Sequence, residues 1–231
     1  MSGPKRILVL YYSLTNQTEL VLKEIIDELV AAGHKIDKRR IQPVDDWTLP
    51  LDKKTFYWNW FKIWIGMNLT QPLHHMDLNP DDYDYIILGF QPWNLAPSMP
   101  VNSFLDSPMA SIFKGKKVIG VVTCRARWER SYRIAKEKIE RAGGRLIDGL
   151  VIMNSEKEPY NMVTTARYLF HGTDMPPDHP LYKYLRPYGI GEKAIKVARE
   201  FGYDLAHRLS DDRLTDTLGW RMVNQPLRTI G

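Results

Sequence analysis

The stretch that most constrains the fold is residues 5–20, where an apolar run passes almost directly into a helical pattern. Residues 7–12 (ILVLYY) are continuously apolar or aromatic, which is typical of a parallel strand covered on both faces. Apolar residues then recur at helical spacing from Leu20 to Leu29. The turn between them, residues 13–18 (SLTNQT), holds three hydroxyl side chains. Free N–H groups and hydroxyls at a helix N-terminus favour a phosphate site, although Ser13 or Thr15 acting as a simple helix cap is the alternative.

Three further apolar runs repeat the pattern of a buried strand, at residues 83–90, 116–123 and 145–153. The segment 34–41 is heavily charged, which favours the edge of a sheet. Helical patterns lie between or after these runs, at residues 101–113, 128–142, 160–170 and 192–209, and the last of them is expected to close the chain. The alternation predicts an α/β fold with a doubly wound, five-stranded parallel sheet.

Composition limits the class of protein. The 231 residues, 44% of them hydrophobic, can form one α/β domain over 1–231 with room for insertions. The single cysteine, Cys124, excludes an internal disulfide, and with no long apolar span a cytoplasmic protein is expected. Lysines and arginines are scattered among acidic residues and the net charge is only +5, so we expect no nucleic-acid partner.

The turn at residues 13–18 lacks both the GxGxxG glycines and a Walker lysine. It resembles instead the phosphate loop of flavodoxins, which runs hydroxyl, any residue, Thr, Gly, any residue, Thr and binds FMN. Ser13, Thr15 and Thr18 match that loop, and Asn16 stands where Gly is usual. Asn is the next most tolerant residue for positive φ. The resemblance implies FMN as cofactor, the strand order 2-1-3-4-5, and contacts to the phosphate from Ser13, Leu14, Thr15, Asn16, Gln17 and Thr18.

In that strand order the loops after the third and fourth strands reach the same sheet edge as the turn. Each of these loops carries an indole, Trp93 in the first and Trp128 in the second, and either ring could stack on a flavin or pack on the core. The candidate cofactor contacts in the two loops are Gln91, Pro92, Trp93, Asn94, Thr123, Cys124, Arg125 and Trp128.

Two stretches exceed a minimal flavodoxin, an aromatic-rich insertion at about 44–80 between the second and third strands and a long loop at 154–190 after the fifth. The aromatic residues of the first are too many for one helix face, since Phe56, Trp60 and Ile63 or Trp64 share one side and Tyr57, Phe61 and Ile65 another. A lid over the pocket, a homodimer face and shallow membrane contact are the alternatives, and the first two are favoured. The candidate substrate contacts are Trp58, Trp60, Phe61 and Trp64.

Two adjacent histidines follow this insertion. His74 and His75 point to opposite sides if the segment is extended, and no suitably placed carboxylate or cysteine accompanies them, so no metal site is predicted. One of them remains a candidate acid or base, and His75 is the residue chosen.

A narrower resemblance rests on Gln91-Pro92-Trp93, Thr123-Cys124-Arg125 and the tryptophan-rich insertion. Together these are similar to the flavodoxin-fold proteins of dialkylresorcinol and aryl-polyene pathways. The resemblance implies an aromatase that oxidises a 2,5-dialkylcyclohexane-1,3-dione, made by a ketosynthase partner, to a resorcinol. Arg125 and Arg127 are then candidates to stabilise the enolate.

Other functions use the same cofactor site. An NAD(P)H-dependent quinone reductase is the main alternative. An electron-carrying flavodoxin is disfavoured because such carriers are typically acidic around the flavin, whereas this chain is basic. The remaining alternative is a binding protein that has lost its flavin.

Overall fold

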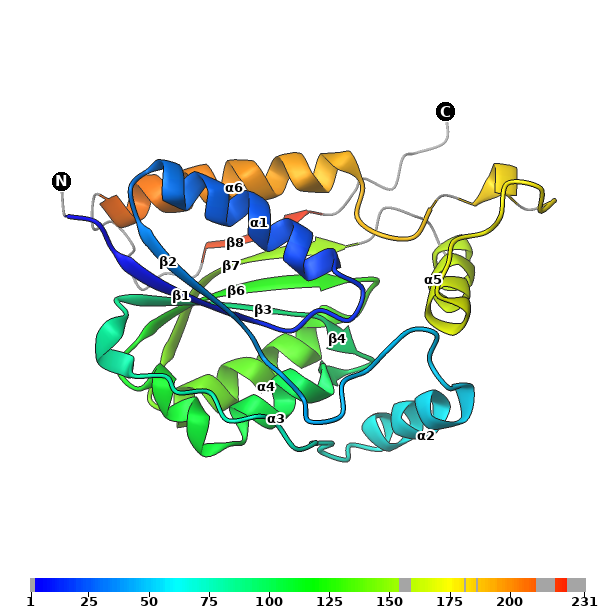
Figure 1. The fold of residues 1–231 in the computed structure, drawn as a ribbon, viewed down its shortest axis with the longest axis horizontal. Coiled ribbons are helices and arrows are strands. Elements are labelled where there is room, and N and C mark those ends of the chain that lie inside the picture. The colour runs from blue at the N-terminus through cyan, green and yellow to red at the C-terminus, as the bar shows by residue number, and fades with distance from the viewer. Residues whose placement is uncertain (1–2, 154–158, 181, 186, 211–218, 224–231) are drawn as a thin grey trace.

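The computed structural model describes residues 3–153, 159–180, 182–185, 187–210 and 219–223, and a parallel sheet runs through its centre (Figure 1). The strand order is β2-β1-β3-β6-β7-β8, and each neighbouring pair is parallel. The first five strands confirm the predicted order 2-1-3-4-5. Their bounds are β1 Arg6–Tyr11, β2 Lys35–Arg40, β3 Tyr85–Phe90, β6 Lys117–Cys124 and β7 Arg145–Met153.

A sixth strand, β8 (Gly219–Val223), pairs with β7 and extends the sheet beyond the predicted five. The expectation that a helix closes the chain was therefore wrong. The sequence GWRMV is short and mixes apolar residues with arginine, so it carries no continuous apolar run that would mark a strand.

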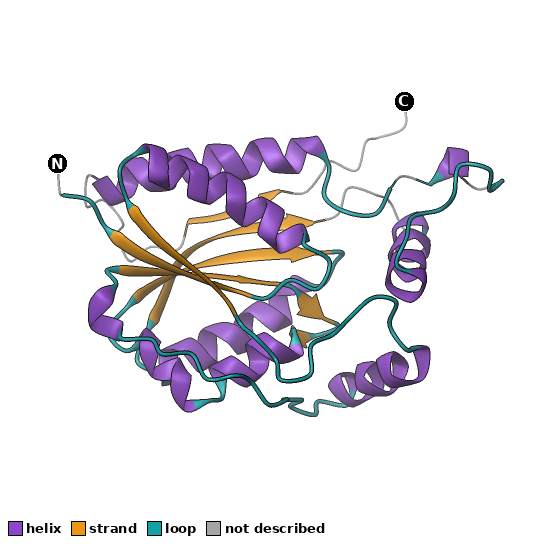
Figure 2. Ribbon diagram, in the orientation of Figure 1, coloured by secondary structure: helices purple, strands orange, loops and turns teal. Residues whose placement is uncertain are grey.

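Helices cover both faces of the sheet (Figure 2). α1 (Gln17–Ala31) and α6 (Glu192–Ser210) pack on one face, and α3 (Met99–Leu105) and α4 (Trp128–Arg141) on the other. Side chains alternate between the two cores, so Ile7 and Val9 of β1 face α1 while Leu8 and Leu10 face α3 and α4. Burial on both faces explains why these strands are continuously apolar.

The helix expected at 101–113 is divided. α3 ends at Leu105, and a separate 3₁₀ helix, η2 (Pro108–Phe113), follows it. Pro108 has no N–H to donate to the preceding turn and its ring restricts the residue before it, which explains the break.

The two long insertions lie beyond the carboxyl ends of the strands, at the right of Figure 1. The first contains α2 (Lys53–Trp64), and the second contains α5 (Tyr160–His171) and the 3₁₀ helix η3 (Tyr182–Tyr184). Residues 154–158, at the start of the second, lie outside the described residues. A small hairpin, β4 (Pro92–Trp93) and β5 (Ala96–Pro97), follows β3. The 3₁₀ helix η1 (Pro80–Asp82) precedes β3. Within the described ranges, no helix combines the length and apolar character needed to cross a bilayer.

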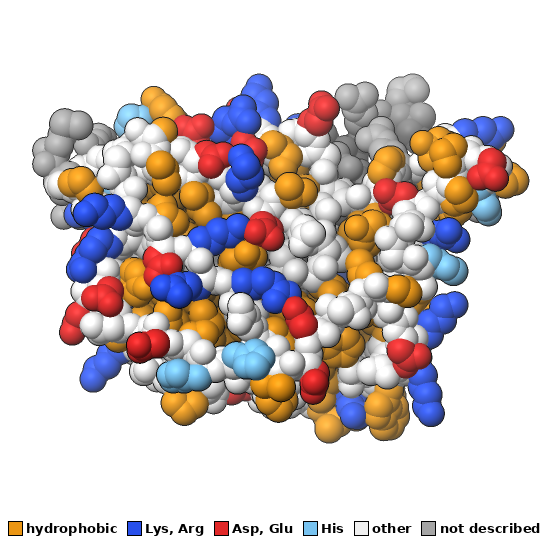
Figure 3. Space-filling model, viewed as in Figure 1, with side chains coloured by type: hydrophobic (Ala, Val, Ile, Leu, Met, Phe, Trp, Pro, Cys, Tyr) orange, Lys and Arg blue, Asp and Glu red, His pale blue; other side chains and the backbone are white. Residues whose placement is uncertain are grey.

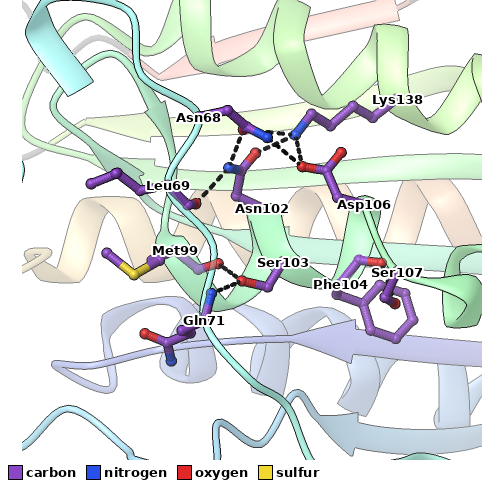
Figure 4. A network of polar contacts seen from close by, with 10 residues as sticks. All are labelled: Asn68, Leu69, Gln71, Met99, Asn102, Ser103, Phe104, Asp106, Ser107 and Lys138. Atoms are coloured by element: carbon purple, nitrogen blue, oxygen red, sulfur yellow. Dashed lines mark hydrogen bonds and ion pairs between the residues drawn. The ribbon is translucent and has the colours of Figure 1, made fainter. Parts of the chain in front are cut away.

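A partly buried polar network fastens the segment after α2 to α3 and α4 (Figure 4). The Lys138 ammonium donates to Asp106 Oδ2 (2.6 Å), Asn102 Oδ1 (2.7 Å) and Asn68 Oδ1 (3.2 Å). Asn102 in turn donates to the Leu69 carbonyl at 2.8 Å. Because Asn68 and Leu69 follow α2 closely along the chain, this network fixes where the insertion leaves the sheet edge.

Candidate functional site

The turn between β1 and α1 has the backbone conformation that the sequence predicted. Asn16 precedes the first helical residue with φ 59° and ψ 0°, in the left-handed region, and its side chain makes no capping hydrogen bond. The first N–H to donate within the helix is that of Leu20, which reaches the Asn16 carbonyl at 3.0 Å. In the described part of the chain, the N–H groups of residues 16–19 have no acceptor.

Side-chain hydroxyls supplement these free donors. Ser13 is 4% exposed and its Oγ has no hydrogen-bond partner among the described residues. The Thr15 hydroxyl lies 3.4 Å from the Tyr188 hydroxyl, a long contact that leaves it available to a stronger acceptor. A buried hydroxyl without a partner is costly, so the turn is prepared for an acceptor that carries several oxygens.

Two other predicted side chains connect the turn to the neighbouring loops. Thr18 Oγ1 lies 2.7 Å from Thr123 Oγ1. The Gln91 amide, oriented to match its neighbours, donates to the Tyr12 carbonyl (2.7 Å) and accepts from the Leu14 N–H (3.1 Å). Gln91, Thr18 and Thr123 therefore hold three loops together at the edge of the sheet, and their polar atoms are largely used in doing so.

A cavity of about 290 Å³ opens from this edge toward α2 and α5. That volume is near the lower end of the ~300–1,000 Å³ common for small-molecule sites. Five parts of the chain join the turn in lining it: the loops after β3 and β6, one face of α2, one face of α5 and a short segment at 188–190. The predicted residues that line it are Leu14, Thr15, Gln17, Thr18, Trp60, Gln91, Pro92, Trp93, Asn94, Thr123, Cys124, Arg125 and Arg127.

The outer wall of the cavity is apolar. α2 contributes Phe56 and Ile63, and α5 contributes Leu169. The two helices contact each other, since the rings of Phe56 and Phe170 meet edge to face with centroids 5.1 Å apart. Asn94 Nδ2 donates to the Trp60 carbonyl at 3.2 Å, which holds α2 over the loop after β3.

The two tryptophans of the loops have different positions. Trp93 lines the cavity and meets the rings of Trp47 and Tyr12 edge to face, at centroid distances of 5.1 and 6.1 Å. Trp128 lies outside the lining and packs against the core and Tyr132, with centroids 5.9 Å apart. The packing alternative therefore describes Trp128, which is not placed as a cofactor contact.

Six other predicted site residues do not line the cavity. His75 is exposed and borders a separate hollow between residues 71–78 and the α3–η2 segment, so it does not approach the two arginines. Trp58, Phe61 and Trp64 are 57%, 41% and 57% exposed and do not line the cavity, whereas Trp60 does. Ser13 and Asn16 shape the turn without lining the cavity itself.

The charge in the cavity is positive. Arg125 and Arg127 are both exposed side chains in the lining, and the described lining residues include no carboxylate. Burial raises the pKa of the Cys124 thiol to about 12, with a smaller contribution from Glu129 that Arg125 partly offsets. Cys124 is therefore a neutral thiol and contributes no nucleophile at neutral pH.

The segment 188–190 closes over the turn, a contact that sequence reasoning missed. Gln17 Oε1 accepts the Ile190 N–H at 2.7 Å, and the Tyr188 ring stacks on Tyr168 with centroids 4.4 Å apart. Burial raises the pKa of Tyr188, so its hydroxyl remains a neutral donor. Gly189 has φ +123°, and a Cβ there would lie 2.5 Å from Gln17 Oε1, so a larger residue does not fit. The sequence YGIG at residues 188–191, with two glycines just before α6, was the signal that could have indicated this contact.

Comparisons with known proteins identify the fold. No protein-family profile and no curated protein matches the chain. Among solved structures, a protein from Bacteroides eggerthii designated a flavoprotein is 16% identical, with a TM-score of 0.50 over 71% of this chain and 98% of its own. A similarly designated protein from Bacteroides uniformis is 20% identical (TM-score 0.49; 68% and 95% covered), and a flavodoxin from the domain Archaea is 14% identical (TM-score 0.47; 88% and 98% covered). The chain has the flavodoxin-like α/β fold.

Proposed function

We propose that this chain is an FMN-dependent oxidoreductase, with the flavin phosphate bound at the turn 13–18. The observation that carries the proposal is the donor set of this turn: free N–H groups at residues 16–19 together with the buried, unpartnered hydroxyl of Ser13. A phosphate dianion offers enough oxygens for these donors and is stabilised by the positive end of α1. The residues present fit the phosphate group.

The rest of the cavity suits the flavin ring system. Trp93 offers an aromatic wall, and residues 123–127 bring backbone groups and two arginines to the same space. When bound, the flavin accepts a hydride from a substrate carbon. The chain's own contribution is to hold the two reactants in contact and to exclude water through α2 and α5.

For the substrate we infer an alkylated cyclic 1,3-dione, as the resemblance to dialkylresorcinol aromatases implies. Phe56, Ile63 and Leu169 supply an apolar wall for an alkyl chain, and Arg125 and Arg127 supply cations for an enolate whose charge is shared by two oxygens. Conversion of the dione to a resorcinol removes one hydride and one proton and includes a tautomerisation; a bound flavin would take the hydride and water the proton. Dioxygen then accepts the two electrons and is reduced to peroxide.

The test is aerobic incubation of the FMN-loaded protein with a dialkylcyclohexane-1,3-dione. We expect resorcinol and peroxide in equal amounts, and none with free FMN or with an FMN-loaded protein in which both arginines are changed to Gln. Flavin bound in the wild-type protein without resorcinol would contradict the substrate assignment, whereas protein that does not bind FMN would contradict the cofactor assignment.

A second candidate is an NAD(P)H-dependent quinone reductase. The exposed guanidinium groups of Arg125 and Arg127 favour it, because they could bind the phosphates of a nicotinamide nucleotide at the same cavity. Rapid bleaching of the bound flavin by NADPH without oxygen or dione, followed by reoxidation by a quinone, would establish this activity. Slow bleaching would favour the dione oxidase.

A further inference from the structure

The outer face of α2 exposes a row of large aromatic side chains to solvent. Trp58, Phe61 and Trp64 are 57%, 41% and 57% exposed, and Tyr57 and Ile65 beside them are 57% and 53% exposed. Figure 3 shows hydrophobic and lysine side chains together at the lower right, where Figure 1 places α2. Solvent exposure of so much apolar surface on one short helix marks an interaction site.

The row is continuous and distinct from the face that lines the cavity. The rings of Trp58 and Phe61 are stacked with centroids 5.9 Å apart, and those of Phe61 and Trp64 are 6.3 Å apart. Phe56 and Ile63 lie about half a turn away on the cavity side. The same helix thus has one apolar side turned to the cavity and another turned away from the protein.

The charge around the row is positive. α2 contains Lys53, Lys54 and Lys62 and no acidic residue, but Lys53 Nζ lies over the Phe170 ring of α5, which leaves Lys54 and Lys62 for the outer face. Lys62 Nζ lies 5.1 Å from the centre of the Trp58 ring, so an ammonium group borders the aromatic row directly. A two-fold contact through this face would bring the same lysines of two copies together, which disfavours a homodimer. Indole rings bordered by lysines suit the headgroup region of an anionic bilayer, where rings enter and ammonium groups meet phosphates.

We propose that the outer face of α2, formed by Trp58, Phe61, Trp64, Lys54 and Lys62, docks the protein on an anionic phospholipid surface. Docking places the inner face of α2, and with it the mouth of the cavity, at the membrane surface. An apolar substrate could then pass from the bilayer into the cavity without crossing water. The docking does not depend on the proposed chemistry, because neither the aromatic row nor the lysines belong to the turn that would bind FMN.

Flotation of the full chain with lipid vesicles tests the proposal. Vesicles of phosphatidylcholine alone are compared with vesicles that also contain phosphatidylglycerol. Each lysine near an anionic surface contributes on the order of a fivefold gain in affinity, so Lys54 and Lys62 predict a preference of roughly 25-fold for the anionic vesicles. High salt should abolish the preference because it shortens the range of the surface potential.

Three variants make the test specific. Trp58→Ser/Phe61→Ser/Trp64→Ser should lower vesicle binding by about tenfold or more. Lys54→Gln/Lys62→Gln should remove the preference for anionic lipid. Tyr203→Ser, which changes an aromatic side chain 59% exposed on α6, should bind as the wild type does. FMN binding and circular dichroism of each variant report folding separately from docking.

Absence of wild-type binding to anionic vesicles would overturn the proposal, as would undiminished binding of the aromatic variant. The oligomeric state, measured by analytical sedimentation, could also overturn the docking proposal. If the wild-type protein is a dimer in lipid-free buffer and the aromatic variant a monomer, the face belongs to a second copy of the chain.

Discussion

Replacement of Lys138 by Met removes a charged group from the junction between the first insertion, α3 and α4. The Lys138 side chain is 9% exposed and its ammonium group binds Asp106, Asn102 and Asn68 at 2.6, 2.7 and 3.2 Å. Methionine fills much the same volume, so the main loss is the charge and its hydrogen bonds rather than packing.

The expected loss of stability depends on how deeply Lys138 and Asp106 are buried. Removal of one member of a fully buried ion pair costs about 3–5 kcal/mol, because the other charge stays buried without compensation. The Asp106 side chain is 25% exposed and keeps a 2.8 Å hydrogen bond from Asn68, so part of its charge remains solvated. We therefore expect Lys138→Met to lower the free energy of unfolding by about 2–3 kcal/mol, or the Tm by roughly 8 °C at this chain length.

The assay is urea and thermal unfolding of the wild type, Lys138→Met, Asp106→Asn and the double variant. The cycle of four proteins should give a coupling energy of about 1–2 kcal/mol, with the double variant close to the worse single one. A Tm change below about 2 °C for Lys138→Met would refute the view that this network anchors the insertion.

The difference in unfolding free energy between the wild type and Lys138→Met should depend on pH in a defined direction. Burial raises the pKa of Asp106, but the hydrogen bonds from Asn68 and Lys138 and the ammonium charge outweigh burial and hold the pKa below its usual value. A depressed folded-state pKa contributes stability above the usual value of about 4, and this contribution is lost as pH falls through the folded-state pKa. The stability difference between wild type and Lys138→Met should therefore be largest at neutral pH and shrink below about pH 3.

Three further predictions concern the cavity. Gly189→Ala should weaken FMN binding by roughly tenfold in a fluorescence titration. The reason is that the alanine Cβ would displace the Gln17 side chain, which holds residues 188–190 over the turn. Unchanged affinity would contradict this role of residues 188–190. Trp60→Ala should lower activity on long-chain diones more than on short-chain ones. In an assay without vesicles, Trp64→Ala should leave the dependence on alkyl-chain length unchanged. Equal effects of the two substitutions would show that the cavity does not bind the alkyl chain. Cys124, with a pKa raised to about 12 by burial, should resist alkylation by iodoacetamide at pH 8 until the protein is unfolded, and rapid labelling of the folded protein would contradict its burial.

The sheet was predictable from the sequence because its strands are buried on both faces. That burial forces continuous apolar runs, and the charged β2 could be placed at the edge by the same reasoning. The positive φ of Asn16 was predictable through the resemblance to the flavodoxin phosphate loop, because Asn16 stands where that loop usually has Gly and Asn is the next most tolerant residue for positive φ. β8 could not be predicted, because its pairing with β7 depends on a contact distant in sequence and GWRMV has no strand periodicity.

The cavity was predicted less completely because its outer wall depends on how the insertions pack. The helical phase of α2 grouped Phe56 and Trp60 with Ile63 or Trp64. Of these, Phe56, Trp60 and Ile63 line the cavity and Trp64 does not. Which side would face inward was not decided by the helix alone, so Trp58, Phe61 and Trp64 were assigned to the substrate although they face solvent. Trp128 and Trp93 could not be distinguished either, since both follow buried strands and only the packing of α4 separates them.

The central claim, that the turn 13–18 binds the phosphate of FMN, is tested most directly by flavin titration of the Ser13→Asp/Thr15→Asp variant. A carboxylate about 5 Å from the phosphate would cost roughly 3 kcal/mol at an effective dielectric constant of about 20, which predicts a loss of affinity of more than about 100-fold. Thr70→Asp, at an exposed residue of the first insertion, adds a negative charge elsewhere and should bind FMN as the wild type does. If the double variant folds and binds FMN with wild-type affinity, the phosphate is not held by this turn and the proposed function is wrong.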